Sequence, residues 1–200
     1  MVSVRLVESV VSLGERELTL LRPRDSVELL DDDAFEQNEF MPYWAELWPS
    51  GLALARTVSE RDLSRARVVE LGCGLGLPSL AAALRGASAL ATDWSAEAVV
   101  LLGRNARRNG ALLTTAVCDW GEPARLLAGA PWDVVLASDV LYERRNADAL
   151  LRLLPRLVGG AGEVLLADPG RPACAPFLER ASARFAVASG GEGVFRLTVA

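Results

Sequence analysis

The sequence predicts an α/β fold: a doubly wound, mostly parallel seven-stranded sheet with an antiparallel C-terminal hairpin, preceded by an N-terminal hairpin and helix. Strand-like runs alternate with helix-like segments from Arg67 onward, and the connections between them are short. The run Trp132–Ala137 is almost continuously apolar, as is usual for a strand buried on both faces of a parallel sheet. A glycine-rich stretch follows the first strand, where sheets of this kind bind ligands.

We expect one domain over residues 1–200, with residues 1–66 as an appendage to a core of residues 67–200. Val4–Val11 and Glu17–Leu21 flank Leu13-Gly14-Glu15 and predict a hairpin. Leu52–Val58 follows Pro49-Ser50 and predicts the helix that leads into the core.

Each strand expected in the parallel part of the core is a short apolar run followed by Gly, Asp or Ser. These strands are Arg67–Leu71, Ala87–Thr92, Leu113–Cys118, Trp132–Ala137 and Glu163–Ala167. Phe185–Ala188 and Val194–Val199 flank a glycine-rich turn and predict the closing antiparallel hairpin.

Helices are expected between these strands. They are Leu77–Arg85, Ser95–Asn109, Glu122–Ala128, Asn146–Leu157 and Arg171–Arg184. Ser95 is the expected N-cap of its helix, with Glu97 in the first turn. Gly159-Gly160 is expected to end the helix that precedes it.

The composition excludes several kinds of catalysis. The 21 basic residues are all Arg, and the chain has no His and no Lys. Ser-His-Asp triads, Schiff bases, Walker A phosphate loops and zinc sites that use His are therefore ruled out. We predict no metal site.

Charge and cysteine usage predict a cytoplasmic protein with no nucleic-acid or membrane partner. The net charge is −5 without a basic stripe, and no apolar run is long enough to span a bilayer. Cys73, Cys118 and Cys174 form no C-x-x-C pair, which fits reduced thiols. The acidic run Asp31-Asp32-Asp33 is expected to form a turn or a helix start.

The glycine-rich stretch Val69–Gly76 has the spacing G-x-G-x-G. A dinucleotide fingerprint places its third glycine one position later, where this chain has Leu77, and the difference counts against NAD or FAD. Asp93 ends the next strand and is suited to accept hydrogen bonds from ribose hydroxyls. Asp119 and Trp120 end the third strand, where an acid and an indole suit an adenine. Three successive strand ends thus predict a nucleoside site.

Three further motifs are Pro42–Gly51 (PYWAELWPSG), Ser138–Glu143 (SDVLYE) and Asp168–Arg171 (DPGR). With the glycine loop, they make the chain from Arg67 onward resemble the class I, seven-β-strand methyltransferases that use S-adenosylmethionine (SAM). Such a core is Rossmann-like. Within this class it resembles the family of small protein lysine methyltransferases and nicotinamide N-methylase-like proteins. The branch that modifies the β subunit of electron transfer flavoprotein looks most similar.

The resemblance implies positions for the methionine part of SAM. Gly72, Gly74 and Gly76 are expected to pass under it, and Glu70 to order that loop. Ser138 is expected where the methionine amine approaches.

The resemblance also implies positions for the nucleoside part. Asp93 is expected to bind the ribose, with Trp94 flanking the adenine. Asp119 and Trp120 are expected to hold the adenine, and Trp48 to close over the cofactor.

Methyl transfer from a sulfonium needs neither His nor Lys, because the leaving group is a neutral thioether. Asp139 and Tyr142, in the pattern D-x-x-Y, are the expected catalytic residues, with positioning first and general base second. The roles of Trp44, Asp168 and Arg171 stay open at this point.

The expected activity is N-methylation of a protein lysine. A small amine or heterocycle is the alternative substrate, and a non-catalytic SAM sensor or scaffold is a second alternative. The oligomeric state and the number of methyl groups added do not follow from the sequence.

Overall fold

The strands form one large sheet and one separate hairpin. In the large sheet they are β3 (Arg67–Leu71), β4 (Ser88–Asp93), β5 (Leu113–Val117), β6 (Trp132–Ser138), β7 (Val158–Ala167), β8 (Phe185–Gly191) and β9 (Val194–Val199), and in the hairpin β1 (Leu6–Leu13) and β2 (Arg16–Pro23). The sheet order is β5-β4-β3-β6-β7-β9-β8. The five neighbouring strands β5, β4, β3, β6 and β7 run parallel to one another. Strand β9 is antiparallel to its neighbours β7 and β8. The predicted fold class is confirmed.

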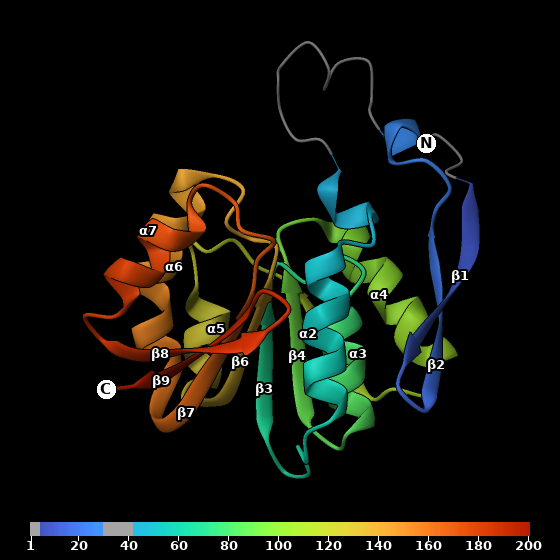
Figure 1. Ribbon diagram of the computed structural model, residues 1–200. Helices are drawn as coiled ribbons and strands as arrows, with labels where there is room; N and C mark the ends of the chain where they lie inside the picture. Colours follow the sequence, from blue (N-terminus) through green and yellow to red (C-terminus); the bar gives the residue numbers. More distant parts are fainter. Residues whose placement is uncertain (1–4, 30–41) are drawn as a thin grey trace.

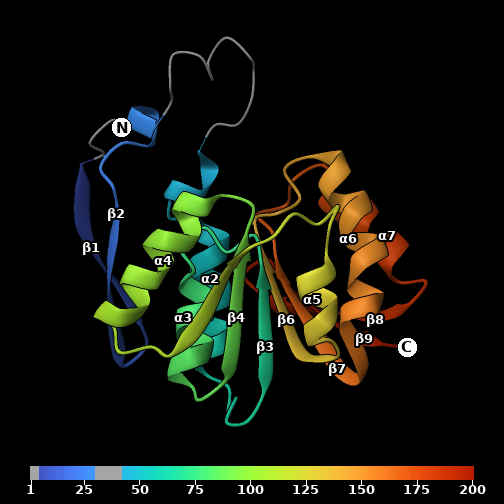
Figure 2. The same cartoon turned by 180° about the vertical axis from the view of Figure 1, so that it is seen from behind.

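Helices cover both faces of the sheet (Figures 1 and 2). One layer contains α2 (Pro49–Ser59), α3 (Leu77–Leu84) and α4 (Ala96–Arg108), and the other contains α5 (Ala124–Gly129), α6 (Arg144–Leu157) and α7 (Cys174–Ala181). Short 3-10 turns lie at η1 (Ser26–Leu29) and η2 (Tyr43–Ala45). The chain moves outward from β3 to β4 and β5, then returns to β6 on the other side of β3. The carboxyl ends of β3 and β6 therefore flank the point where such sheets bind ligands.

Residues of the central strands alternate between the two layers. In β6, Val134 and Leu136 belong to the core under α2 and α3, whereas Val135 and Ala137 belong to the core under α6 and α7. Side chains of successive strand residues point to opposite faces, so a strand covered on both sides needs apolar residues throughout. This explains the apolar run recognised in the sequence.

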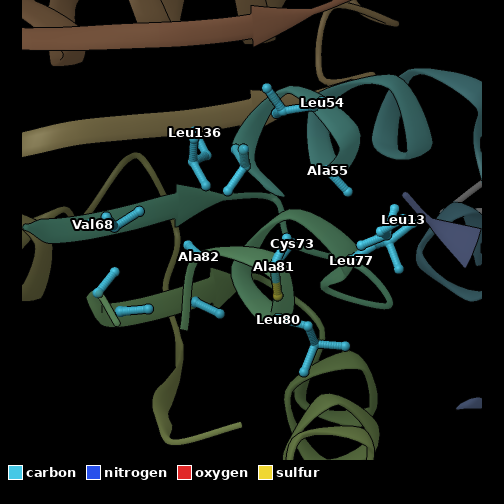
Figure 3. Close-up of a cluster of buried hydrophobic side chains, with 14 of the residues drawn as sticks. Leu13, Leu54, Ala55, Val68, Cys73, Leu77, Leu80, Ala81, Ala82 and Leu136 are labelled. Atoms are coloured by element: carbon cyan, nitrogen blue, oxygen red, sulfur yellow. The ribbon is translucent and has the colours of Figure 1, made fainter. Parts of the chain in front are cut away.

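The core between α2, α3 and the sheet is shown in Figure 3. Leu54 of α2, Leu80 of α3 and Leu136 of β6 are fully buried in it. Leu13, at the end of β1, reaches the edge of the same cluster. The N-terminal hairpin therefore shares the core of residues 67–200.

Asn105 of α4 and Asn109, the C-cap of that helix, hold the hairpin against the domain. The Asn105 side chain accepts from the Leu21 backbone N–H at 2.8 Å and donates to the Leu21 carbonyl at 3.0 Å. Asn109 binds Thr19 in the same way, with both distances 2.9 Å. These two residues are four positions apart, about one helical turn, so both side chains can bind the backbone of β2. Helix α4 lies beside β2 (Figure 1).

Strand β7 begins at Val158, earlier than the predicted Glu163, so that boundary was wrong. Val158 pairs with Trp132 ahead of a bulge in the β6–β7 ladder. A Cβ at Gly162 would lie 2.6 Å from the Trp132 carbonyl oxygen. Gly162 therefore allows close strand pairing at the bulge. Gly159-Gly160, predicted to end the preceding helix, lies inside β7, and α6 passes into the strand at Val158, which is already extended.

Other boundaries moved by a few residues. Helix α6 begins at Arg144, with Glu143 rather than a later residue at its N-cap. Of the predicted 171–184 helix only Cys174–Ala181 is α-helical, because the residues before it form a turn on Asp168. Ser95 is the N-cap of α4 as predicted and accepts from the Ala98 N–H at 3.1 Å.

The computed structural model describes residues 5–29 and 42–200. The acidic run Asp31-Asp32-Asp33, predicted to be a turn or helix start, lies outside the described residues. Within the described ranges, each helix is too short or too polar to cross a membrane.

Candidate active site

A cavity of about 660 Å³ opens where the parallel strands end. Segments that follow β3, β4, β5 and β6 line it, together with the segment before α2 and part of α6. The sequence-predicted residues in its wall are Trp48, Gly72, Gly74, Gly76, Asp93, Trp94, Asp119, Trp120, Ser138, Asp139 and Tyr142. The structure thus gathers residues from widely separated parts of the chain around one space.

The glycine loop needs its glycines for backbone reasons. Gly72, Gly74 and Gly76 have φ values of +65°, +50° and +74°, in the left-handed region that disfavours side chains. A Cβ at Gly74 would lie 3.0 Å from the carbonyl oxygen of Trp44, so the segment before α2 packs directly on this loop. A Cβ at Gly76 would overlap Leu102, 2.3 Å from its Cδ1 atom.

Glu70 is the one predicted cofactor residue outside the cavity wall, among those the structure describes. It is fully buried, and its Oε2 accepts from the Ser79 N–H at 2.9 Å in the first turn of α3. Gly76, the N-cap of α3, has no side chain to cap the helix, so Glu70 serves that end. Burial raises the pKa of Glu70 to about 8.

Asp93 joins the end of β4 to the glycine loop. Its Oδ2 accepts from the Gly74 N–H at 2.8 Å, and its Oδ1 accepts from the Ser95 N–H at 3.0 Å. Burial raises the pKa of this carboxyl group, although both hydrogen bonds oppose the shift. Each carboxylate oxygen has a second lone pair, which leaves acceptor capacity for a ligand in the cavity.

The side expected to hold adenine contains two indoles and an acid. A Cβ at Gly72 would lie 3.6 Å from Cζ2 of Trp120, so that indole stands beside the glycine loop. Asp119 accepts from the Gly121 N–H at 2.7 Å, which fixes the turn after β5. Trp94 lines the cavity and is 50% exposed, so its ring is accessible for stacking.

Asp139 and Arg171, which also line the cavity, form an ion pair. Asp139 has a φ of +59° and its side chain is 5% exposed. Nε of Arg171 donates to Oδ1 of Asp139 at 2.6 Å, and Nη2 donates to the same oxygen. Asp139 does not cap the helix that follows it, which is a common role for an Asp after a strand, because the N-cap of α6 is Glu143.

Three aromatic rings line the same cavity, and one of them, that of Trp48, lies under the guanidinium of this ion pair. The Tyr43 ring lies 5.5 Å from Tyr142 and 6.2 Å from Trp48, between ring centroids. Nε1 of Trp48 donates to the Tyr43 carbonyl at 2.8 Å. The centroid of the Trp48 ring lies 5.7 Å from Cζ of Arg171, whose guanidinium stacks over the ring. Burial raises the pKa of Tyr142, so its phenol remains protonated at neutral pH.

The sequence reasoning missed Tyr43 and left Arg171 undecided. Tyr43 lies in the PYWAELWPSG motif, which was its only signal. Arg171 depends on a contact with a residue 32 positions away, which no local pattern reports. Trp44, also left open, lines the cavity. Ser138 faces α2, where a Cβ at Gly51 would lie 3.6 Å from its Oγ.

The residues present fit SAM. Asp93 and the glycine loop offer polar groups at one part of the cavity, and the indoles offer apolar faces. Oδ2 of Asp139 is buried without a hydrogen-bond partner, which suits a cationic ligand group. Across residues 5–29 and 42–200, no group of three or more Cys, Asp or Glu is arranged to hold a metal ion.

Two relatives with known activities are similar in sequence. The electron transfer flavoprotein beta subunit lysine methyltransferase of Danio rerio is 35% identical over 136 residues, which make up 65% of this chain and 51% of that protein. The Rattus norvegicus protein of the same name is 32% identical over 166 residues, 79% of this chain and 62% of that protein. The chain therefore spans about half the length of the first of these relatives.

Among solved structures, the T. thermophilus 16S rRNA N2 G1207 methyltransferase in complex with AdoMet and guanosine has a TM-score of 0.73 and 17% identity. The match covers 99% of this chain and 51% of that one, and it shows the fold. The sequence profile described as Lysine methyltransferase matches residues 34–183. SAM is the cofactor that this family and fold imply. The extent of the profile match shows that the chain belongs to the lysine methyltransferase family.

Proposed function

We propose that this chain is a SAM-dependent N-methyltransferase that modifies a lysine side chain of another protein. The observation that carries the proposal is the unpartnered, buried Oδ2 of Asp139 in a cavity whose wall includes the rings of Tyr43, Tyr142 and Trp48. A carboxylate oxygen next to aromatic faces suits an alkylammonium group. The nucleoside-binding residues line the same cavity, so donor and acceptor would meet there.

When bound, SAM supplies an electrophilic methyl group on a sulfonium and leaves as a neutral thioether. Asp139 orients the amine through Oδ2, and the aromatic rings give it a partly apolar surrounding. An apolar surrounding disfavours the charged ammonium and so lowers the pKa of the amine, which must lose a proton before it can react. Tyr142 remains a protonated donor near the amine, in keeping with positioning rather than proton abstraction.

The names of the relatives support a protein substrate. The Danio rerio and Rattus norvegicus proteins are named for the beta subunit of electron transfer flavoprotein. We take that subunit as the first candidate acceptor for this chain. A small amine is the competing acceptor class, and the experiment below separates the two.

The test is incubation of the purified protein with tritiated SAM and a cell extract, followed by separation of protein from small molecules. These 200 residues contain no Lys, so the chain cannot label itself on a lysine. We expect label in the protein fraction, dependent on Asp139 and lost in Asp139→Asn. Label confined to small molecules would reject a protein acceptor, and no label anywhere would reject an enzyme.

We also propose a reducing, cytoplasmic setting without a nucleic-acid or membrane partner. All three cysteines are buried and unpaired in the structure. The net charge of −5 disfavours binding to phosphate backbones.

A further inference from the structure

Arg171 holds Asp139 by one oxygen only. Both Nε and Nη2 of Arg171 donate to Oδ1 of Asp139, whereas Oδ2 is buried and has no hydrogen-bond partner. A buried carboxylate oxygen without a partner costs free energy unless a ligand supplies the missing donor. Glu70 and Asp168 also have one such oxygen each, but only Asp139 of these three lines the cavity. Oδ2 is therefore the atom left for the substrate.

Arg171 is itself fixed at both ends. Its backbone N–H donates to Oδ1 of Asp168 at 2.7 Å, beside the Gly170 N–H at 2.8 Å. At its other end the guanidinium is bound to Asp139 and lies over the Trp48 ring. The side chain is 29% exposed. These contacts hold the positive charge of the Arg171 guanidinium beside Asp139.

We propose that Arg171 is a positioning residue that neutralises Asp139, so that the substrate amine meets a neutral ion pair through Oδ2. This inference rests on the proposed function. A bare carboxylate would stabilise the ammonium form and raise the pKa of the amine. The guanidinium offsets that effect while Oδ2 still accepts a hydrogen bond. The amine then releases its proton to solvent water more readily, and its lone pair becomes available.

Other charged groups also line the cavity. They are Glu46, Asp93, Asp119, Glu143, Arg145 and Arg152. Asp93 and Asp119 accept from backbone N–H groups, and Glu143 forms an ion pair with Arg145. Among the cavity-lining residues that the structure describes, only Asp139 has a buried side-chain oxygen without a hydrogen-bond partner, and that oxygen is Oδ2.

The first test measures binding of n-butylammonium, a mimic of the lysine side chain, to protein saturated with S-adenosylhomocysteine at neutral pH. Arg171→Met removes the charge, so we expect butylammonium to bind about tenfold more tightly. Arg171→Lys keeps the charge, so its affinity should stay near that of the unaltered protein. Arg180→Met breaks an exposed Arg–Asp pair outside this cavity and is the matched control.

The second test follows the pH dependence of methyl transfer to electron transfer flavoprotein β subunit. In Arg171→Met we expect the acidic limb of kcat to move up by about one pH unit, with KM unchanged or lower. A purely structural role would lower kcat at every pH and raise KM. Arg171→Gln is the second neutral variant if Arg171→Met does not fold.

The inference is overturned if butylammonium binds Arg171→Met and Arg171→Gln no more tightly than it binds the unaltered protein. It is also overturned if butylammonium binds none of these three proteins measurably. Failure of the proposed function has a different signature: SAM does not bind, or the unaltered protein transfers no methyl group, whatever the butylammonium affinities are.

Discussion

The backbone N–H of Gly74 donates a 2.8 Å hydrogen bond to Oδ2 of Asp93, so the acid at the end of β4 holds the glycine turn after β3. The neighbouring Cys73 N–H donates to the carbonyl of Thr92 at 2.9 Å. These two hydrogen bonds join the loop after β3 to the end of β4 in the cavity wall. The same carboxylate that is positioned to bind a ribose also fixes the loop that would pass under the methionine part of SAM.

Asp93→Asn should weaken SAM binding by about tenfold or more, because the charge and one of the two carboxylate acceptors are lost. Isothermal titration calorimetry measures this directly. Asp133→Asn is the matched control: Asp133 also accepts from a backbone N–H, that of Arg67, but at the other end of the sheet. Unchanged SAM affinity in Asp93→Asn would remove its assignment to the ribose.

Glu70 should make stability fall as pH rises. Its folded pKa of about 8 lies above the ordinary value of 4.5, so the folded state holds this proton more tightly than the unfolded chain. The contribution is therefore complete at low pH, declines above about pH 4.5, and is lost above about pH 8. Glu70→Gln keeps an acceptor for Ser79 and has no proton to lose.

The measurement is the free energy of unfolding in urea across this pH range. The difference between Glu70→Gln and the unaltered protein isolates Glu70, because the raised pKa of Asp93 is present in both. We expect the variant to gain relative stability as pH rises. Parallel pH profiles would show that Glu70 is ionised throughout the range.

Gly76→Ala should destabilise the fold through two effects. A left-handed backbone costs a non-glycine residue about 1–2 kcal/mol, and overpacking against buried Leu102 adds about 1–3 kcal/mol. Gly14→Ala separates the two effects, because Gly14 has a φ of +66° and a Cβ there would have no atom within 4 Å. Equal losses of unfolding free energy in both variants would show that Leu102 moves aside without cost.

The sequence predicted the fold class, and all of the predicted site residues except Glu70 line the cavity, because both depend on local signals. Apolar runs followed by Gly, Asp or Ser locate the strand ends, and parallel strands bring these ends to one edge. The bulge at Gly162 was not predictable in this way, since its cause is the carbonyl of Trp132 on another strand. The pairing of Asp139 with Arg171 depends likewise on which strands are neighbours.

The docking of the N-terminal hairpin was also beyond local reasoning, since Asn105 and Asn109 read as ordinary polar residues of a helix. Asn105→Ala should accelerate hydrogen exchange at the Leu21 amide and leave the Thr19 amide protected by Asn109. Exchange measured residue by residue by NMR tests this. Equal acceleration at Leu21 and Thr19 would mean that the hairpin detaches as a unit.

The central claim is that the amine at Oδ2 of Asp139 belongs to a protein lysine. The most direct measurement is acid hydrolysis of protein labelled with tritiated SAM, followed by chromatography of the amino acids. We predict that the label elutes with Nε-methylated lysine and is absent when Asp139→Asn replaces the unaltered protein. Label on methylated histidine or arginine, or label that persists in Asp139→Asn, would contradict the account.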